Sequence, residues 1–482
     1  MATIQCMVHE AGVISRDRPA LVGEDVRILY GELDLMVSST AMKLREAGVK
    51  QGDVVGLFLE NSWPQIVLIF ALIRVGAVAC PLHTRLPLAA LQQHMDLAGA
   101  RTLIARVRDA SAAHVQHLRV LHPDTLVSRT LEDTGDAKDY TVPLNQPATI
   151  VFTSGSSGTP KAAVLTYGNH YYNALGANTN IRLHSEDTWL LSLPLYHVGG
   201  LGIVFRCLQS GAAMVLMKEK ERVEEAIARH RVTMMSLVTA QLHRLLEHGI
   251  SKEVAGKLRG IMLGGGPCSA ELLQRARAQG LPVFMTYGMT EMGSQVTAMR
   301  PDSPPDKQMT AGVALRYREV RIMEDGEIHV RGPTRFAGYR DGDELRTPFD
   351  ADGWFATGDL GALDEEGYLH VMGRKDDMFI SGGENIHPQE IEQALCAVTG
   401  IHGAWVVPMN DEVFGLRPVA YVDADRPMDA DEIKVLLSDV LPRFKIPVAI
   451  YPWPDELKQE GLKKSRATLR AFLGVRGTGD LR

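Results

Sequence analysis

ATIVFTSGSSGTPK, residues 148–161, is the stretch from which the fold and the chemistry of this chain are best interpreted. Its first part, from Ala148 to Phe152, is a short apolar run that predicts a buried strand. The loop that follows combines hydroxyl side chains, two glycines and Lys161, which together offer side-chain and backbone donors to a polyphosphate. We therefore interpret the segment as a strand that leads into a phosphate-binding loop.

Two other interpretations of this loop have to be weighed. A Walker loop requires GxxxxGK followed by Ser or Thr, whereas Lys161 is preceded by Pro160 and followed by Ala162. A P-loop NTPase is therefore disfavoured. A flexible Ser/Gly surface loop fits the composition equally well, so the loop residues alone do not separate it from a phosphate site.

Outward from this loop, helix-like and strand-like segments alternate up to about residue 370, which predicts an α/β fold with helices on largely parallel sheets. The apolar runs that begin at Asp53, Thr233 and Gly260 predict strands, and the segment from Glu224 to Arg231 predicts a helix. From Glu319 onward, short alternating runs separated by Asp-Gly turns predict small hairpins and hence a β-rich subdomain.

The charged segment Gly373–Asp377 precedes a glycine turn, and a new helix is predicted to begin at Pro388, which suits the first helical position. We place a domain boundary here. It separates a large N-terminal domain of α/β and β-rich subdomains, residues 1–373, from a small mobile C-terminal α+β domain, residues 374–482.

Composition points to a globular protein with a small-molecule substrate. The 482 residues are 45% hydrophobic and 23% charged, and about 150 residues per domain suggests roughly three units. The net charge of −7 comes without blocks of like charge, which argues against nucleic acid or an anionic membrane as partner. A homo-oligomer stays open.

The sequence lacks the patterns of a signal peptide and of a membrane span, which predicts a soluble cytoplasmic protein. The first residues have no basic flank before an apolar run, and the apolar stretch Ile66–Cys80 is interrupted by Arg74 and too short to span a membrane. The five cysteines are scattered without CxxC spacing, so neither a disulfide framework nor a zinc site is predicted, and most are expected to be buried.

Seven motifs follow one another in a fixed order across nearly the whole chain. They are the loop at 153–161, PLYH at 194–197, GGGP at 264–267, YGMTE at 287–291, TGD at 357–359, GRKDD at 373–377 and SGGENIHPQEIE at 381–392. In these motifs the chain resembles the adenylate-forming superfamily of acyl-CoA synthetases, luciferases and peptide-synthetase adenylation domains. The resemblance implies ATP, Mg²⁺ and CoA as reactants and cofactors, and an acyl-adenylate as the intermediate.

The resemblance assigns the phosphates of ATP to the loop and to YGMTE. It implies that Thr290 contacts the α-phosphate and that Glu291 supports Mg²⁺, although Glu291 by itself would more simply be a solvated carboxylate at a helix start. The loop residues implied to bind the departing phosphates are Thr153, Ser154, Gly155, Ser156, Thr159 and Lys161.

The adenosine part of the nucleotide is implied to lie on three other motifs. Tyr287 offers an aromatic face to adenine, and the glycines allow the backbone a close approach to the base. Asp359 suits two ribose hydroxyls, and Arg374 resembles a second ribose or phosphate contact. The glycines are Gly264, Gly265 and Gly266.

The C-terminal part of the chain is implied to carry a catalytic lysine and a hinge. The family pattern PxxxxGKxxR is only partly kept in DELKQEGLKKSR at 455–466, where the Lys-x-x-Arg spacing selects Lys463, with Lys464 as the alternative. Asp376 falls on the hinge position of the family. Rotation about it is implied to replace Lys463 by Gly382 and Gly383, which would line the pantetheine tunnel of CoA.

The acid pocket is expected around PLYHVGGLGIVFRC, residues 194–207. His197 sits where the family places a residue that orients the carboxylate, although a structural histidine is the simpler interpretation. Three glycines are expected to leave room for a ring, and Arg206 is the candidate for a second, distal anion, or else a structural helix arginine. The glycines are Gly199, Gly200 and Gly202.

Three stretches narrow the substrate within the superfamily. Residues 187–212, residues 262–291 and the ending at 456–466 resemble the o-succinylbenzoate:CoA ligases of menaquinone biosynthesis more than other members. The implied substrate is thus an aromatic carboxylic acid. An aryl- or fatty-acyl-CoA ligase is the first alternative, a nucleotide-binding module without chemistry the second, and a luciferase or carrier-loading enzyme also remains.

Overall fold

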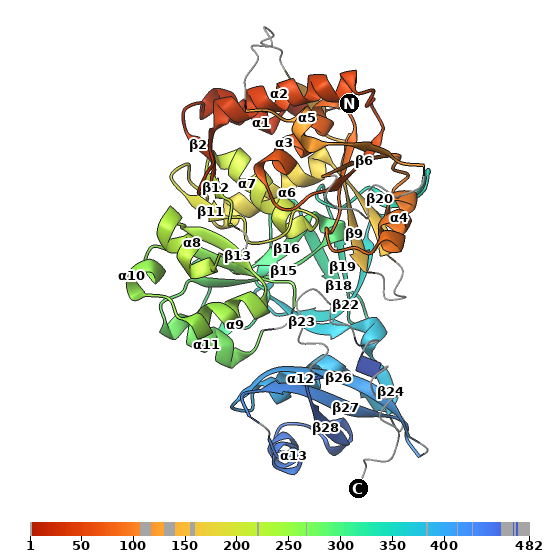
Figure 1. Ribbon diagram of the computed structural model, residues 1–482. Coiled ribbons are helices and arrows are strands. Elements are labelled where there is room, and N and C mark those ends of the chain that lie inside the picture. The colour runs from red at the N-terminus through yellow and green to blue at the C-terminus, as the bar shows by residue number, and fades with distance from the viewer. Residues whose placement is uncertain are drawn as a thin grey trace. The chain divides into compact units, whose positions relative to one another are not determined.

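The computed structural model describes residues 2–106, 117–129, 140–154, 160–218, 221–266, 268–381, 384–411, 413–426, 428–454, 466 and 469–470 (Figure 1). Two compact units divide the chain. The first comprises Met1–Gly266, Ala276–Arg321 and His329–Ala356, and the second comprises Pro267–Arg275, Ile322–Ile328 and Thr357–Arg482.

An eight-stranded sheet in the first unit contains β9, the strand that was predicted to lead into the phosphate loop. Its order is β21-β20-β10-β9-β5-β4-β6-β7, and the strands from β9 to β7 pair in parallel, whereas β10 and β20 are antiparallel. Its strands are β4 (Val54–Phe58), β5 (Val78–Pro81), β6 (Thr102–Ala105), β7 (Arg119–Leu121), β9 (Pro147–Ser154), β10 (Pro160–Thr166), β20 (Gly338–Asp341) and β21 (Glu344–Arg346). β9, which leads into the phosphate loop, therefore lies at the change from parallel to antiparallel pairing.

A nine-stranded sheet forms the other large layer of this unit, in the order β17-β16-β15-β14-β13-β11-β12-β2-β3. Its central strands, from β15 to β2, are parallel, and antiparallel strands extend it at both ends. Its strands are β2 (Pro19–Val22), β3 (Arg27–Leu29), β11 (Thr188–Leu190), β12 (Ala213–Val215), β13 (Met234–Leu237), β14 (Gly260–Leu263), β15 (Val283–Met289), β16 (Ser294–Ala298) and β17 (Val313–Ala314). A two-stranded sheet joins β1 (Thr3–Gln5) to β8 (Thr141–Pro143).

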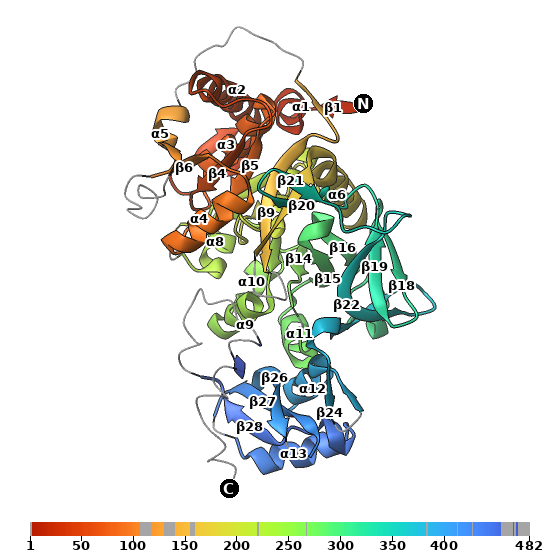
Figure 2. The same cartoon turned by 90° about the vertical axis from the view of Figure 1, so that its right-hand side faces the viewer.

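Helices cover these sheets, and α6 contacts strands of both (Figures 1 and 2). Each of the two long apolar helices α3 and α7 ends on a glycine in the left-handed region, Gly76 and Gly211, where a side chain would strain the backbone. The helices are α1 (Met7–Ile14), α2 (Tyr30–Glu46), α3 (Trp63–Val75), α4 (Leu88–Leu97), α5 (Pro123–Leu126), α6 (Tyr167–Asn180), α7 (Val198–Ser210), α8 (Val223–His230), α9 (Thr239–His248), α10 (Lys252–Ala255) and α11 (Ala270–Ala278).

The second unit contains a small domain with its own core. Strands β26 (Ile401–Asp411) and β27 (Gly415–Ala424) are antiparallel, and β28 (Ala449–Pro452) adds in parallel. Buried side chains of α12 (Pro388–Cys396) and α13 (Ala430–Ser438), such as Leu395 and Leu437, pack with those of the sheet. Strands β24 (Phe379–Ser381) and β25 (Glu384–Ile386) pair with each other in this unit. A separate four-stranded sheet, which is not confined to the second unit, has the order β18 (Glu319–Ile322), β19 (Glu327–Arg331), β22 (Phe355–Leu363) and β23 (Leu369–Arg374).

The prediction of an α/β fold with a large N-terminal and a small C-terminal domain is confirmed, and the strands expected after Asp53, Thr233 and Gly260 are β4, β13 and β14. The domain boundary near residue 374 stays a prediction. The apolar stretch Ile66–Cys80 is a buried helix followed by a strand, and no helix of the described chain is long and apolar enough to cross a bilayer.

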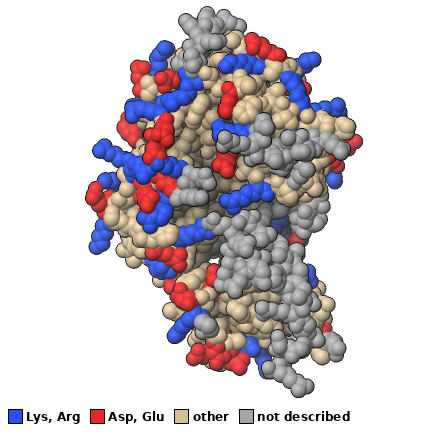
Figure 3. All heavy atoms as spheres, in the orientation of Figure 1, with Lys and Arg blue, Asp and Glu red and all other residues tan. Residues whose placement is uncertain are grey.

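The state of the cysteines and the distribution of surface charges also agree with the expectations from the sequence. All five cysteines are free, and three of them are buried, as expected. On the face drawn in Figure 3, basic and acidic side chains are interspersed, in line with the absence of charge blocks in the sequence.

Candidate active site

The two ends of the phosphate loop are held in register by the β9–β10 hairpin. Thr153 pairs directly with Lys161, and Ser154 pairs with Pro160. The hairpin is anchored because its own residues Ile150, Val151 and Ala162 are buried. Lys161 itself is exposed. Of the predicted loop residues, Gly155, Ser156 and Thr159 lie outside the described part of the chain.

Glu291 lies on a short 3-10 helix, η2 (Thr290–Met292), that follows β15, and it is only 8% exposed. Its Oε1 atom accepts a hydrogen bond of 2.6 Å from the hydroxyl of Tyr339. The ammonium nitrogen of Lys161 lies 5.2 Å from the centroid of the same tyrosine ring. Tyr339 therefore contacts both the predicted metal ligand and the predicted phosphate ligand.

Sequence reasoning missed Tyr339. It lies in β20, where it pairs with Ala163 of β10. No local pattern signals the residue, because its partners come from distant parts of the chain: Lys161 lies in β10, the neighbouring strand of the same sheet, and Glu291 lies in η2, outside that sheet.

A Mg²⁺ site at Glu291 fits the chemistry of the residues present. Within the described residues, no three His, Cys, Asp or Glu side chains are grouped to hold a metal ion. Mg²⁺ with a nucleotide usually takes only one or two carboxylates and binds otherwise to phosphates and water. The second carboxylate oxygen of Glu291 has no hydrogen-bond partner in the described chain, so it can take part in such a site.

The predicted adenine site lies at the carboxyl ends of two neighbouring parallel strands. β14 ends at Leu263, which pairs with Met285 of β15, so Gly264 and Tyr287 follow closely on adjacent strands. This is where ligands bind in open α/β sheets. A Cβ atom on Gly264 would lie 2.6 Å from Oγ1 of Thr286, so the absence of a side chain is required by packing.

The other residues of this site are arranged for a close backbone approach. Gly265 has a φ of +83°, which favours glycine, and a Cβ atom on Gly266 would meet no atom within 4 Å. Thr290 directly follows β15, at the first position of η2. The structure thus places the predicted adenine and α-phosphate residues on one strand end and the loop beside it.

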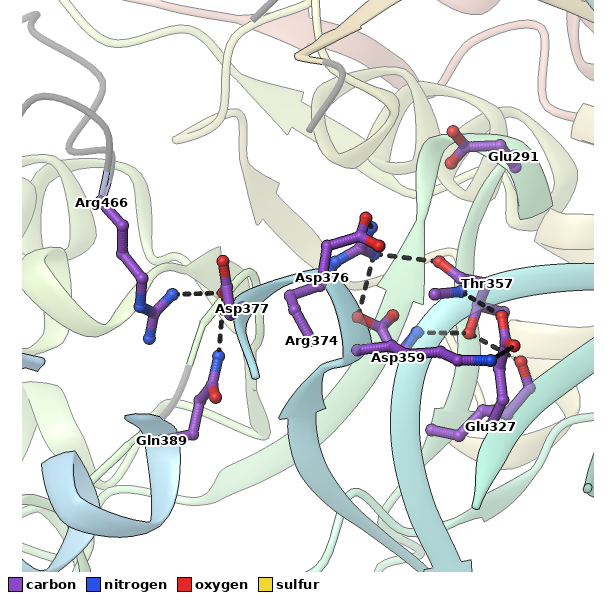
Figure 4. A network of polar contacts seen from close by, with 12 residues as sticks. Glu291, Glu327, Thr357, Asp359, Arg374, Asp376, Asp377, Gln389 and Arg466 are labelled. Carbon is purple, nitrogen blue, oxygen red and sulfur yellow. Dashed lines mark hydrogen bonds and ion pairs between the residues drawn. The ribbon is translucent and has the colours of Figure 1, made fainter. Parts of the chain in front are cut away.

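Asp359 and Arg374 occupy directly paired positions of β22 and β23. Nη1 of Arg374 donates to Oδ1 of Asp359 at 3.1 Å and to the carbonyl oxygen of Thr357 at 2.9 Å. Gly358, between them, has a φ of +72°. As Figure 4 shows, the guanidinium lies over the TGD segment, whose backbone is held by Thr357 Oγ1 donating to Ile328 and by the amide of Gly358 donating to Glu327.

Arg466 belongs to the predicted lysine motif and is fixed by two carboxylates. It donates to Oε1 and Oε2 of Glu392 at 2.7 and 2.9 Å, and it also pairs with Asp377. Asp377 accepts a further hydrogen bond from Gln389, as Figure 4 shows. Burial raises the pKa of Glu392, although the neighbouring guanidinium opposes that shift. We name the trio Arg466, Glu392 and Asp377 the C-terminal clasp.

The predicted hinge residue Asp376 is exposed and directly precedes Asp377 in the 3-10 helix η4 (Lys375–Asp377). Its Oδ2 atom lies 3.7 Å from Nη2 of Arg374. Four residues predicted to take part in the domain motion lie outside the described part of the chain: Lys463, Lys464, Gly382 and Gly383.

The expected acid pocket is built at the start of α7. His197 is the exposed N-cap residue, and its ring lies 4.6 Å from that of Tyr196. A Cβ atom on Gly200 would lie 2.2 Å from the carbonyl oxygen of Pro194, and one on Gly199 would lie 2.8 Å from Leu193. Glycine is therefore required at Gly200, where the close atom is backbone, whereas the close atom at Gly199 is the end of the Leu193 side chain, which can move.

Gly202 differs from its two neighbours. A Cβ atom there would approach Ser294 no closer than 3.5 Å, which is ordinary contact. The idea that glycines leave room for an aromatic ring thus has structural support at Gly202, whereas Gly200 is explained by local packing.

Arg206 is 4% exposed and has only neutral partners. Nε donates to Asn178 at 2.9 Å, Nη1 donates to Gln295 at 3.2 Å, and the guanidinium lies 4.3 Å from the ring centroid of Trp189. Nη2 is buried without a hydrogen-bond partner. Burial lowers the pKa of Arg206 to about 10, and no carboxylate of the described residues pairs with it.

Arg318 is a second buried guanidinium in this region, 6% exposed. It donates to the carbonyl oxygens of Gln295, Arg316 and Asn173. Burial, followed by the positive charge of Arg206, lowers the pKa of Arg318 to about 9. Two uncompensated cations close together make this region favourable for an anion.

Comparison with known proteins agrees with this arrangement. The family model described as AMP-binding enzyme matches residues 9–340, and the model described as AMP-binding enzyme C-terminal domain matches residues 390–464. The 2-succinylbenzoate–CoA ligase of Geobacillus kaustophilus is 34% identical over 477 residues, which cover 96% of either chain.

Solved structures give the same result. The o-succinylbenzoate CoA synthetase of Bacillus subtilis in complex with the acyl-adenylate intermediate OSB-AMP superposes with a TM-score of 0.86 at 30% identity, covering 97% of each chain. The same enzyme in complex with ATP and magnesium ion gives a TM-score of 0.84 at 30% identity, covering 94% of this chain and 96% of that one.

Proposed function

Because the chain belongs to the AMP-binding enzyme family, we propose that it is an ATP-dependent 2-succinylbenzoate:CoA ligase of menaquinone biosynthesis. The reaction forms an acyl-adenylate with release of pyrophosphate and then a thioester with release of AMP. The choice of acid rests on Arg206, a buried guanidinium without a carboxylate partner among the described residues. It is also supported because the chain is similar over nearly its full length to such ligases.

In the first half-reaction a carboxylate attacks the α-phosphate while pyrophosphate leaves, so the protein mainly neutralises charge and positions the reactants. We assign the departing phosphates to Lys161 and to the loop that begins at Thr153, and the α-phosphate to Thr290. Glu291 would hold Mg²⁺, which supplies further positive charge to the phosphates when bound. Ser154, Gly155, Ser156 and Thr159 complete the proposed loop.

We assign the nucleoside to the strand ends described above. Tyr287 would stack on adenine beside the backbone of Gly264, Gly265 and Gly266. Asp359 would accept hydrogen bonds from the ribose hydroxyls, and Arg374, which already donates to Asp359, orients that carboxylate. A charged acceptor of this kind binds hydroxyl donors more strongly than a neutral one.

The acid is proposed to lie along the start of α7. His197 would help to orient the reacting carboxylate, and the aromatic ring would pass Gly202. Arg206 would then meet the second carboxylate of the dicarboxylic acid, and its unpartnered Nη2 is a donor available for that purpose. Pairing would offset the cost of burying the guanidinium without a counter-ion.

For the second half-reaction we propose the motion implied by the family motifs. The small domain would rotate at Asp376, near the predicted boundary at residue 374, and exchange Lys463 for Gly382 and Gly383 beside the pantetheine arm of CoA. A lysine suits the first step because its compact charge can lie between two anions that must meet. We propose a cytoplasmic location, and a homo-oligomer stays a prediction.

A panel of acids tests the proposed substrate. Pyrophosphate release should be measured with 2-succinylbenzoate, benzoate and a medium-chain fatty acid, each with ATP and Mg²⁺. The proposal expects 2-succinylbenzoate to give the highest kcat/KM by orders of magnitude. A higher value for benzoate or the fatty acid would instead support an aryl- or fatty-acyl-CoA ligase, and no acid-dependent release would support a binding module.

A further inference from the structure

We propose that Tyr339 is a positioning residue for MgATP, which fixes the metal-binding carboxylate of Glu291 and sets its spacing from Lys161. The inference rests on the proposed ATP-dependent chemistry but not on the choice of acid. The hydroxyl of Tyr339 donates to Oε1 of Glu291 at 2.6 Å, a short hydrogen bond to an ionised acceptor. It leaves the other oxygen of the carboxylate for the metal.

The segment that carries Tyr339 also holds the backbone of Glu291. The amide of Phe336 donates to the carbonyl oxygen of Glu291 at 2.8 Å. The ring of Phe336 packs edge-on against that of Tyr339, with the centroids 4.7 Å apart. Main chain and side chain of Glu291 are thus fixed by two residues three positions apart.

This segment is itself anchored to the core of the first unit. Nδ2 of Asn169, on α6, donates to the carbonyl oxygens of Pro333 and Arg335 at 2.9 and 2.8 Å. The amide of Ala337 donates to the carbonyl oxygen of Val164 on β10. Residues 333–339 therefore have a fixed position relative to the strand that carries Lys161.

The ring of Tyr339 also contacts the positively charged side chain of Lys161. Nζ of Lys161 lies 5.2 Å from the centroid of Tyr339, within the range of a cation–π contact. One rigid aromatic side chain thus contacts both the acidic metal ligand and the basic phosphate ligand. Since charge stabilisation depends on placement within a fraction of an ångström, loss of the hydroxyl is expected to affect the metal-dependent part of nucleotide binding.

Equilibrium binding of ATP by calorimetry, without any acid present, tests this directly. Tyr339→Phe keeps the ring and its packing and removes only the hydroxyl. We expect the Kd of ATP with saturating Mg²⁺ to rise on the order of tenfold, the effect of losing one hydrogen bond to a charged group. The Kd of ATP in EDTA should change by less than about twofold. The control is Tyr171→Phe, at a partly buried tyrosine of α6.

A double-mutant cycle with Glu291→Gln separates positioning from a structural role. In the Glu291→Gln background, Tyr339→Phe should produce no further loss of Mg²⁺-dependent affinity. The inference would be overturned if Tyr339→Phe weakened ATP binding equally with and without Mg²⁺, weakened it in EDTA alone, or did not weaken it at all. It would also be overturned if the effects of Tyr339→Phe and Glu291→Gln on ATP affinity were independent and additive. Wild-type protein that fails to bind ATP would instead contradict the proposed function itself.

Discussion

Nη1 of Arg374 donates to Oδ1 of Asp359 at 3.1 Å across directly paired positions of β22 and β23. The guanidinium therefore holds this carboxylate in one orientation. Two motifs 15 residues apart in sequence form a single unit for the proposed ribose contact.

Asp359→Asn is expected to lower kcat/KM for ATP by about 10- to 100-fold, because hydrogen bonds to a charged acceptor contribute about 1.5–3 kcal/mol each. Steady-state pyrophosphate release at varied ATP measures this effect. Asp343→Asn is the matched control, since the Asp343 side chain is 96% exposed. An unchanged kcat/KM for ATP in Asp359→Asn would exclude the ribose assignment.

Arg206→Met, which keeps most of the side-chain volume but removes the charge, is expected to lower kcat/KM for 2-succinylbenzoate by about 100-fold or more, the effect of losing a buried charge pair. Turnover of an analogue in which one carboxylate is replaced by hydrogen measures whether the loss concerns the second anion. The preference of the wild type for the dicarboxylate should largely disappear in the variant. Unchanged turnover of 2-succinylbenzoate would refute the assignment.

Arg466→Met is expected to destabilise the small domain by about 3–5 kcal/mol, because Glu392 is left as a buried carboxylate without its main counter-ion. The double variant Arg466→Met with Glu392→Met should recover most of that loss in urea unfolding. Lys434→Met, at a surface ion pair with Asp431, is the control and should change stability by less than about 1 kcal/mol. A single variant as stable as the wild type would show that the C-terminal clasp contributes nothing.

His170 predicts a pH dependence of stability. The ring is stacked on Phe205 at 4.4 Å and hydrogen-bonds to Thr149 at 2.8 Å, and burial lowers its pKa to about 3. The unfolded imidazole, with a pKa near 6.5, takes up a proton in acid while the folded one stays neutral. The unfolded state thus binds more protons, so stability is lost as pH falls from about 6.5 toward 3, by at most about 1.4 kcal/mol per pH unit.

Urea unfolding at about pH 7.5 and about pH 5.5 measures this contribution. His170→Gln should show a smaller decrease in free energy of unfolding between the two pH values than the wild type. His248→Gln, at a half-exposed histidine of α9, is the control. Equal pH dependence in wild type and His170→Gln would contradict the prediction.

The sequence allowed the fold class and the local elements of the site to be predicted because their signals are local. The apolar run before Thr153 became β9, and the segment after it joins β9 to β10. The residues of YGMTE and GGGP could be placed together only by resemblance, and the structure adds the reason, which is the parallel pairing of β14 and β15. Lys463 and the loop glycines remain predictions.

Long-range contacts were not predictable. Tyr339 meets Lys161 through the pairing of β20 with β10, and it meets Glu291 of η2 through a side-chain hydrogen bond. No periodicity or motif indicates either contact. The neutral surroundings of Arg206, from Asn178 and Gln295, likewise arise from elements distant in sequence. Packing also gives a different reason for the glycine at position 200, which was expected to leave room for a ring. The carbonyl oxygen of Pro194 accounts for the lack of a side chain at Gly200.

We propose that a single protein forms the adenylate of 2-succinylbenzoate and converts it to the CoA thioester. Mass spectrometry of purified protein with ATP, Mg²⁺ and 2-succinylbenzoate, first without and then with CoA, measures both steps. We expect the acyl-adenylate and pyrophosphate in the first reaction, and the thioester and AMP in the second. No acyl-adenylate in the first reaction, or no thioester in the second, would contradict this activity.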